Sequence, residues 1–205
     1  VSDLVAPRAP SPMPARYIFV SDVHLDATAP QARQQFLEFL RAHVAPPAAA
    51  RALYILGDLF ELWVGDDDAA EDTRAVLAAL RELTDSVIAC FLLHGNRDFL
   101  IGDEFCRRTG CQLLPDPVIA DLDGERVLLT HGDALCTDDH PYQELRSIVR
   151  DRTWQRRFLD LPLADRRLLA DEARAGSRAH TARTIPRIMD VNDAAVTAAF
   201  TAARV

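Results

Sequence analysis

The sequence predicts an α/β sandwich, and three observations lead to this fold class. Short apolar runs alternate with amphipathic stretches over the first half of the chain, as expected for strands alternating with helices. A hairpin pattern follows them. Several of the apolar runs stop abruptly at an acidic, histidine or asparagine side chain. We therefore expect a layered domain whose strand ends gather polar groups.

The predicted strands are short runs of β-branched, aromatic and other apolar residues. They cover residues 17–21, 52–56 and 87–93, and a hairpin whose arms cover 117–122 and 125–130. Asp123-Gly124 lies between the two arms and is a typical two-residue hairpin turn.

The helices are predicted from apolar residues at helical spacing. A first helix lies around residues 34–41 and ends before Pro46-Pro47, and others cover 71–83 and 101–109. Residues 142–175 are rich in Arg and Leu, are broken once at Pro162, and are predicted as a helical hairpin. After Pro186 we expect one alanine-rich helix over 188–203.

This reading divides the chain into four parts. The proline-rich residues 1–15 are expected to form a flexible leader, with Met13 a possible true start. The core is expected to span 16–140, a helical lid 141–187, and a helix returning to the core 188–205.

Composition bounds the class of protein. The 205 residues and 22.7 kDa fit one domain with a proper core. A net charge of -8 argues against a nucleic-acid-binding surface, which needs a basic patch. The four cysteines have no CxxC spacing and are expected to be reduced, mostly buried thiols. No apolar run approaches the roughly 20 residues of a membrane span, and no signal peptide is visible, so we expect a cytoplasmic protein.

Polar side chains follow four of the predicted strands. Asp22 and His24 follow the first, Asp58 the second, Asn96 the third and His131 the second hairpin arm. Strands that end together at one edge of a sheet bring such residues close to one another. Mixed Asp, Asn and His ligands without thiolates suit Mn or Fe(II), with Zn or Mg as alternatives. Each motif alone is a common turn, and only their order along the chain favours a metal site.

Asp58 is the natural bridge between two ligand groups. Two metals about 3.5–4 Å apart promote in-line displacement at phosphorus. Glycines at 57, 95 and 132 permit close approach of the backbone, and Arg97 adds a planar cation suited to a phosphate.

These motifs resemble a known family. Asp22-Val23-His24, Gly57-Asp58, Gly95-Asn96-Arg97-Asp98 and His131-Gly132-Asp133 are similar to those of the calcineurin-like metallophosphoesterases, which have an αββα sandwich and two metals. Longer segments resemble the UDP-2,3-diacylglucosamine pyrophosphohydrolases of lipid A biosynthesis. They are 54–61, 63–68, 94–100, 131–139 and 188–192.

The resemblance implies Mn²⁺-dependent hydrolysis of UDP-2,3-diacylglucosamine to UMP and 2,3-diacylglucosamine 1-phosphate. It implies that Asp22, His24 and Asp58 hold one metal, and that Asp58, Asn96 and His131 hold the other. Asp58, Asn96 and Arg97 would be catalytic. The substrate would contact Asn96, Arg97, Asp139, Ser177, Thr181 and Thr184. The two threonines stand where relatives often have Asn and Lys, and Arg183 is the candidate to replace the missing ammonium. His94 is expected to support the site without binding the metal.

The family also closes its metal site with a Gly-His-Thr-His motif on a later strand. The chain reaches Val205 before such a motif, and we therefore expect it to be a fragment or an incomplete form of the enzyme, with metal binding weakened.

The predicted lid has an apolar stripe flanked by arginines. Its simple interpretation is a hairpin packed on its own apolar residues. Beside a pyrophosphatase site it favours binding of acyl chains, with the arginines touching anionic headgroups at the cytoplasmic leaflet of the inner membrane. We expect a peripheral monomer. The stripe comprises Trp154, Phe158, Leu159, Leu161, Leu163, Leu168 and Leu169, and the arginines are Arg152, Arg156, Arg157, Arg166 and Arg167.

Two alternative functions share these motifs. A general metallophosphoesterase acting on nucleotides or diesters needs the metal ligands without the apolar lid. A non-catalytic UDP-lipid binder is compatible with the absence of the closing histidines.

Overall fold

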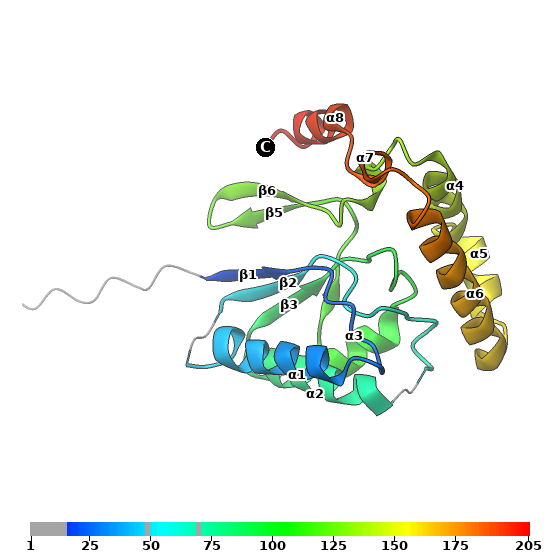
Figure 1. The fold of residues 1–205 in the computed structure, drawn as a ribbon. Helices are drawn as coiled ribbons and strands as arrows, with labels where there is room; N and C mark the ends of the chain where they lie inside the picture. The colour runs from blue at the N-terminus through cyan, green and yellow to red at the C-terminus, as the bar shows by residue number, and fades with distance from the viewer. Residues whose placement is uncertain (1–15, 48–49, 69–70) are drawn as a thin grey trace, which may run out of the picture.

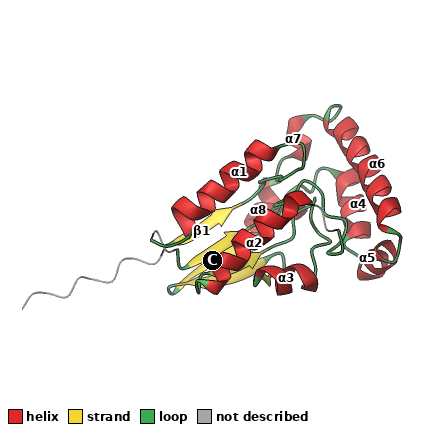
Figure 2. Cartoon of the chain, turned by 90° about the horizontal axis from the view of Figure 1, so that it is seen from below, coloured by secondary structure: helices red, strands yellow, loops and turns green. Residues whose placement is uncertain are grey.

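The structure, a computed structural model, describes residues 16–47, 50–68 and 71–205. It is built in layers around a small parallel sheet (Figure 1). Helices α1, α2 and α3 cover one face, the β5–β6 hairpin lies over the other, and α8 lies beyond the hairpin. Seen from below, α4, α5 and α6 gather at one end of the layers (Figure 2). The predicted α/β architecture is therefore present.

The central sheet has four parallel strands in the order β1-β2-β3-β4. Apolar and aromatic residues form the first three strands, which were predicted, and β2 is buried along its whole length. Because the strands are parallel, their carboxyl ends meet at one edge of the sheet. The strands are β1 (Tyr17–Val20), β2 (Ala52–Ile55), β3 (Ala89–Leu92) and the two-residue β4 (Gln112–Leu113), which the sequence did not reveal.

The main core lies between this sheet and three helices. These are α1 (Pro30–Phe39), continued by a π-helical turn over Leu40–Val44, α2 (Glu71–Asp85) and α3 (Asp103–Thr109). Leu40, Ile55 and Leu80 are each no more than 2% exposed, and burial of each such side chain contributes about 1.5–3 kcal/mol. Cys90 and Cys111 are buried in the same cluster.

A second apolar cluster joins the opposite face of the sheet to the hairpin. Strands β5 (Val118–Leu122) and β6 (Glu125–Leu129) pair antiparallel, as predicted. Tyr54, Leu93 and Leu129 form the buried centre of this cluster. The hairpin thus fixes the position of the loop that follows β6.

Residues 140–181 form three helices, which we call the helical layer: α4 (His140–Val149), α5 (Arg152–Leu159) and α6 (Leu163–Thr181). The expectation of a single break at Pro162 was wrong. A second break occurs because the Asp151 side chain accepts hydrogen bonds from the backbone N–H groups of Thr153 and Trp154, which starts a new helix.

The expectation of one helix over 188–203 was also wrong. The chain forms α7 (Pro186–Met189), leaves the helical conformation, and then forms α8 (Asp193–Ala203). Asn192 caps α8 by accepting from the N–H groups of Ala194 and Ala195.

Two arginines attach α6 to the loop after β2. Arg166 is 2% exposed, donates to the Val64 carbonyl at 2.6 Å, and forms an ion pair with Asp67. Arg167 pairs with Asp68. A buried guanidinium cannot reach a membrane surface, so Arg166 does not have the headgroup contact expected from the sequence.

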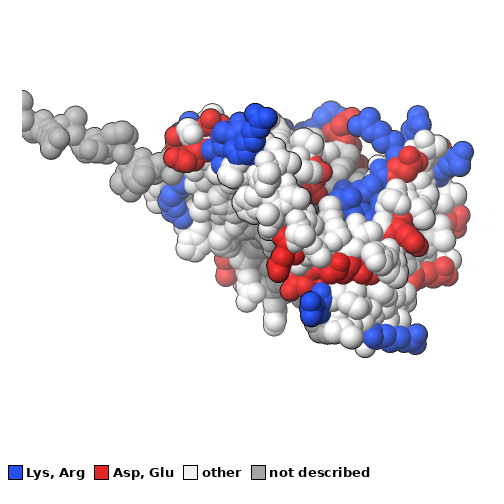
Figure 3. All heavy atoms as spheres, turned by 90° about the horizontal axis from the view of Figure 1, so that it is seen from above, with Lys and Arg blue, Asp and Glu red and all other residues white. Residues whose placement is uncertain are grey.

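Charges of both signs are interspersed on the face of the molecule drawn in Figure 3. No helix among the described residues combines the length and the apolar character that crossing a bilayer requires.

Candidate metal centre and adjoining pocket

The predicted polar residues meet where β1, β2 and β3 end, and the backbone there is unusual. Asp22, His24 and Asp58 all adopt left-handed conformations, with φ of 52°, 51° and 53°. Such conformations cost on the order of 1 kcal/mol for a residue other than glycine and are typical of functional sites. The N–H groups of Asp22 and His24 donate to the carbonyls of Gly57 and Asp58, at 3.2 and 3.0 Å. The first two loops are thereby joined.

The first group of ligands comprises Asp22, His24 and Asp58, whose candidate ligand atoms all lie within 4.8 Å of one another. His24 Nε2 lies 3.8 Å from Asp22 Oδ1 and 3.7 Å from Asp58 Oδ2. His24 Nδ1 lies 2.8 Å from Glu61 Oε2. That contact lies outside hydrogen-bond geometry, and Nδ1 is buried without a hydrogen-bond partner among the described residues. On the other side of the ring, Nε2 faces the carboxylate oxygens of Asp22 and Asp58, an arrangement that a cation satisfies.

The second group comprises Asn96 and His131, with Asp58 shared. The His131 ring places Nδ1 2.9 Å from the Leu56 carbonyl oxygen, which fixes the proton on Nδ1. Nε2 then faces Asn96 Oδ1 at 3.3 Å and Asp58 Oδ1 at 3.9 Å. The two oxygens of the Asp58 carboxylate therefore face different ligand groups, which is the geometry that a bridging role requires.

Two glycines permit this close approach. A Cβ atom on Gly95 would lie 2.0 Å from Asp58 Oδ1, and one on Gly57 would lie 2.6 Å from His131 Nδ1. Gly57 also has φ of +97°. Any side chain at either position would displace a predicted ligand.

Asp98 holds the two loops together from behind. It is fully buried, and its carboxylate accepts hydrogen bonds from the N–H groups of Asp58, Leu59, Phe60 and Gly95. Burial, followed by the nearby Asp58 charge, raises the pKa of Asp98 to about 6, and these N–H groups oppose the shift. Burial is also the largest cause of the raised pKa of Asp58. A bound cation would stabilise both carboxylates.

The donor set fits a divalent cation. All five residues predicted as ligands converge here, their ligand atoms are oxygen and nitrogen, and no thiolate is among them.

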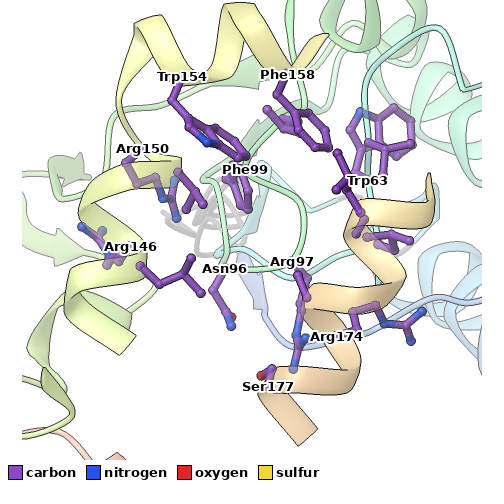
Figure 4. Close-up of a pocket in the computed structure, with 18 of the residues that line it drawn as sticks. Trp63, Asn96, Arg97, Phe99, Arg146, Arg150, Trp154, Phe158, Arg174 and Ser177 are labelled. Carbon is purple, nitrogen blue, oxygen red and sulfur yellow. The ribbon is translucent and has the colours of Figure 1, made fainter. Parts of the chain in front are cut away.

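A cavity of about 660 Å³ adjoins this centre, between the strand-end loops and the helical layer. Its lining has a polar part with Asn96, Arg97 and Ser177, and an aromatic part, as Figure 4 shows. Trp154 stacks on Phe158 at 5.0 Å between ring centroids. The aromatic lining residues are Trp63, Phe99, Tyr142, Trp154 and Phe158, and we call all but Tyr142 the aromatic wall.

The other predicted substrate residues do not line this cavity. Asp139 is 4% exposed, caps α4 through the Tyr142 N–H, and has its oxygens 3.1 Å from His180 Nε2. Thr184 donates to the His180 carbonyl at 2.8 Å, and Thr181 is exposed at the end of α6. These three residues therefore lie outside the cavity lining that contains Asn96 and Arg97.

His94 has the supporting position expected for it. One ring nitrogen lies 2.7 Å from the Ile101 carbonyl oxygen, and burial lowers its pKa.

Several residues around the site were not assigned a role from the sequence. Glu61 and Asp98 stand inside the motifs quoted above, and that position was the available signal. Arg150, at the end of α4, donates to the Gly95 carbonyl at 2.9 Å and stacks on Phe99 with 5.6 Å to the ring centroid. No local pattern marks an arginine with such a distant partner.

Comparisons with known proteins bear on the identity of the chain. It is 47% identical over 190 residues to the UDP-2,3-diacylglucosamine hydrolase of Stenotrophomonas maltophilia strain R551-3, an alignment that covers 89% of this chain and 75% of that protein. The protein of the same name from Neisseria meningitidis serogroup B is 47% identical over 187 residues, covering 91% and 75%. That from Aromatoleum aromaticum is 47% identical over 179 residues, covering 87% and 72%.

The remaining comparisons add little. No family model matches the chain. The crystal structure of Pseudomonas putida nuclease MPE aligns with 52% of this chain and 50% of that one, at 23% identity and a TM-score of 0.34, a likeness too low to establish a shared fold. The identity to these relatives is 47% and extends over most of both chains. The chain belongs to the UDP-2,3-diacylglucosamine hydrolase family.

Proposed function

We propose that the chain hydrolyses the pyrophosphate bond of UDP-2,3-diacylglucosamine, a step of lipid A biosynthesis, with two Mn²⁺ ions. The products would be UMP and 2,3-diacylglucosamine 1-phosphate. One observation carries the proposal: a single cavity joins Asn96 and Arg97, beside the candidate metal centre, to an aromatic wall to which both the strand-end loops and the helical layer contribute. A substrate with a pyrophosphate and acyl chains needs both parts.

One Mn²⁺ would be held by Asp22, His24 and Asp58, and the other by Asp58, Asn96 and His131. The two ions would activate water at neutral pH and neutralise charge developing on the phosphate.

The protein's own residues position the substrate. The backbone N–H of Arg97 donates to Asp58 Oδ1 at 2.8 Å, which fixes the base of the Arg97 side chain next to the shared ligand. Its guanidinium would bind phosphate oxygens through two parallel hydrogen bonds. The Ser177 hydroxyl, across the cavity on α6, would bond to a polar group of the substrate.

The aromatic wall would exclude water and bind acyl chains, each buried methylene contributing about 0.8 kcal/mol. Exposed leucines on the helical layer, with Leu168 60% and Leu169 44% exposed, support peripheral contact with the inner membrane. Co-sedimentation with anionic vesicles tests this contact. Weaker co-sedimentation in 0.5 M salt than in 0.05 M salt would support a contribution from the arginines of the helical layer.

The test of the proposed function compares two substrates with Mn²⁺ present. We expect kcat/KM for the diacylated UDP-sugar to exceed that for the deacylated UDP-sugar by at least about 100-fold, because the aromatic wall has nothing to bind in the latter. Equal turnover of the two would instead support the general metallophosphoesterase. Tight binding of metal and diacylated substrate without turnover would support the non-catalytic binder.

A further inference from the structure

We infer that α4 is a positioning element for the second ligand group, because one face of this helix fixes the loops that carry His131 and Asn96. The inference rests on the metal-binding role proposed for these two residues. The face consists of side chains spaced four residues apart, which therefore lie above one another on the helix, and all of them line the cavity. They are Tyr142, Arg146 and Arg150.

Asp133, two residues after His131, connects α4 to the His131 loop. Its side chain is 7% exposed, and Oδ2 accepts hydrogen bonds from the Tyr142 hydroxyl at 2.6 Å and from Arg146 Nε at 2.8 Å. The Gln143 amide adds a bond to the Asp133 carbonyl at 2.8 Å. Hydrogen bonds between charged groups are stronger than those between neutral groups, so the loop is firmly held against the helix.

Asp116 holds the same loop from the other side. Its Oδ1 accepts from the backbone N–H of His131 at 3.1 Å and from the Thr130 hydroxyl at 2.7 Å. Its Oδ2 is buried without a hydrogen-bond partner among the described residues and lies 3.8 Å from the Arg146 guanidinium. A buried carboxylate needs a nearby positive charge, and Arg146 supplies it here. One arginine thus stabilises both Asp116 and Asp133, the carboxylates that flank the ligand.

Arg150 extends this support to the loop of Asn96. Its guanidinium donates to the carbonyl of Gly95, the residue before Asn96, at 2.9 Å. In Figure 4 the Arg150 side chain points from α4 toward Phe99, over whose ring it stacks. The same guanidinium lies 3.8 Å from Asp133 Oδ2. Arg150 therefore joins the two loops that supply the second ligand group.

The first ligand group has different supports. Among the described residues, α4 forms no hydrogen bond or ion pair with the loop that carries His24. Helix α6 reaches that region instead, through the ion pairs of Arg174 with Asp26 and Glu61. Substitutions in α4 should therefore weaken the metal site of His131 and spare that of His24.

A metal titration tests the role of Arg146. The 205-residue chain labelled with ¹⁵N-histidine is titrated with Zn²⁺, a diamagnetic probe, and the imidazole shifts of His131 and His24 report the two sites in one sample. We expect Arg146→Gln to weaken the His131 site at least about fivefold and to leave the His24 site within twofold. Arg157→Gln is the matched control. Its guanidinium lines the same cavity from α5 and, within the described structure, forms no ion pair with either carboxylate.

A second pair of variants tests the acceptor of the His131 N–H. Asp116→Ala removes this acceptor and should weaken the His131 site at least about tenfold. Asp116→Asn keeps an oxygen that can accept, so its loss should be less than about threefold. Equal losses in these two variants would overturn the inference, because a rescue by the amide is what positioning requires.

The titration with Arg146→Gln can also overturn the inference. It does so if the His131 site stays within twofold of the unmodified chain, if both sites weaken equally, or if Arg157→Gln has the same effect.

Amide hydrogen exchange without metal separates this inference from the proposed function. In Arg146→Gln the His131 N–H should exchange at least about tenfold faster, since its acceptor Asp116 loses the stabilising charge. The Leu25 N–H, bonded to the Leu59 carbonyl at 2.9 Å, should keep its rate. If Zn²⁺ moves neither imidazole of the unmodified chain, the proposed function fails, while the exchange rates still test positioning. An unchanged His131 exchange rate in Arg146→Gln overturns the positioning role of α4.

Discussion

The edge of the sheet and the helical layer build their parts of the site in different ways. At the sheet edge, backbone hydrogen bonds and left-handed residues fix the ligands, as between Asp22 and Gly57. In the helical layer, long arginine side chains make the attachments, as between Arg166 and Asp67. The contact between Asp22 and Gly57 joins backbone groups 35 residues apart, whereas that between Arg166 and Asp67 joins side chains 99 residues apart.

This difference predicts which property of the site each region controls. Substitutions at the sheet edge should lower the turnover of every substrate and weaken metal binding, because the candidate metal ligands lie there. Changes in the helical layer should be smaller and should discriminate between substrates. The predictions below test this division, starting with the largest effect.

Replacing the shared ligand should have the largest effect. Asp58→Ala removes the carboxylate that faces both ligand groups, so we expect turnover to fall by at least about 10³-fold and both metal sites to weaken. Activity assays and metal titration measure this. Asp138→Ala is the control. Among the described residues, the exposed Asp138 carboxylate accepts hydrogen bonds only from Asn192. Equal losses in the two variants would refute the bridging role.

Asp98→Asn should destabilise the sheet edge. Each carboxylate oxygen accepts from two backbone N–H groups, so an amide NH₂ would face donors in either orientation. We expect the free energy of unfolding to fall by about 2–4 kcal/mol, measured by urea denaturation. Asp103→Asn, on the exposed first turn of α3, should change it by less than about 0.5 kcal/mol. A destabilisation no larger than that of the control would contradict the role given to Asp98.

Phe158→Ala should change substrate preference and leave the metal centre intact. The ring forms part of the aromatic wall, so we expect kcat/KM for the diacylated substrate to fall about tenfold and that for the deacylated one to stay the same. Glu172→Ala, on the exposed face of α6, should alter neither. Equal loss on both substrates would show that the helical layer acts on the chemistry itself.

Gly176→Ala should have the smallest effect. This glycine is within α6, and a Cβ there would meet no atom within 4 Å, so we expect about 0.5–1 kcal/mol of stabilisation from helix propensity. Thermal denaturation measures it. A lower melting temperature would indicate a contact that the structure lacks.

The sheet edge was predictable because its signals are local. Apolar runs that stop at Asp22, Asp58 or Asn96 specify both the strand and the ligand, and parallel pairing then brings the ligands together. The shared position of Asp58 also followed from its place between the other ligands. The structure confirms the first three strands and the hairpin.

The helical layer was harder because its signals are ambiguous or distant. Asp151 and Asn192 are N-caps, yet within an alanine- and arginine-rich stretch they read as ordinary helix-surface residues. The attachment of Arg166 depends on a partner 99 residues away, which periodicity does not reveal. The two-residue β4 is too short to show a pattern.

The left-handed backbone at Asp22, His24 and Asp58 restricts which residues can occupy these positions, independently of metal binding. In a saturation library at position 22, selected only for soluble expression, Asn and Gly should survive and Val and Ile should be depleted, since β-branched residues rarely tolerate that conformation. Evolution at this site is therefore confined first by conformation and only afterwards by catalysis.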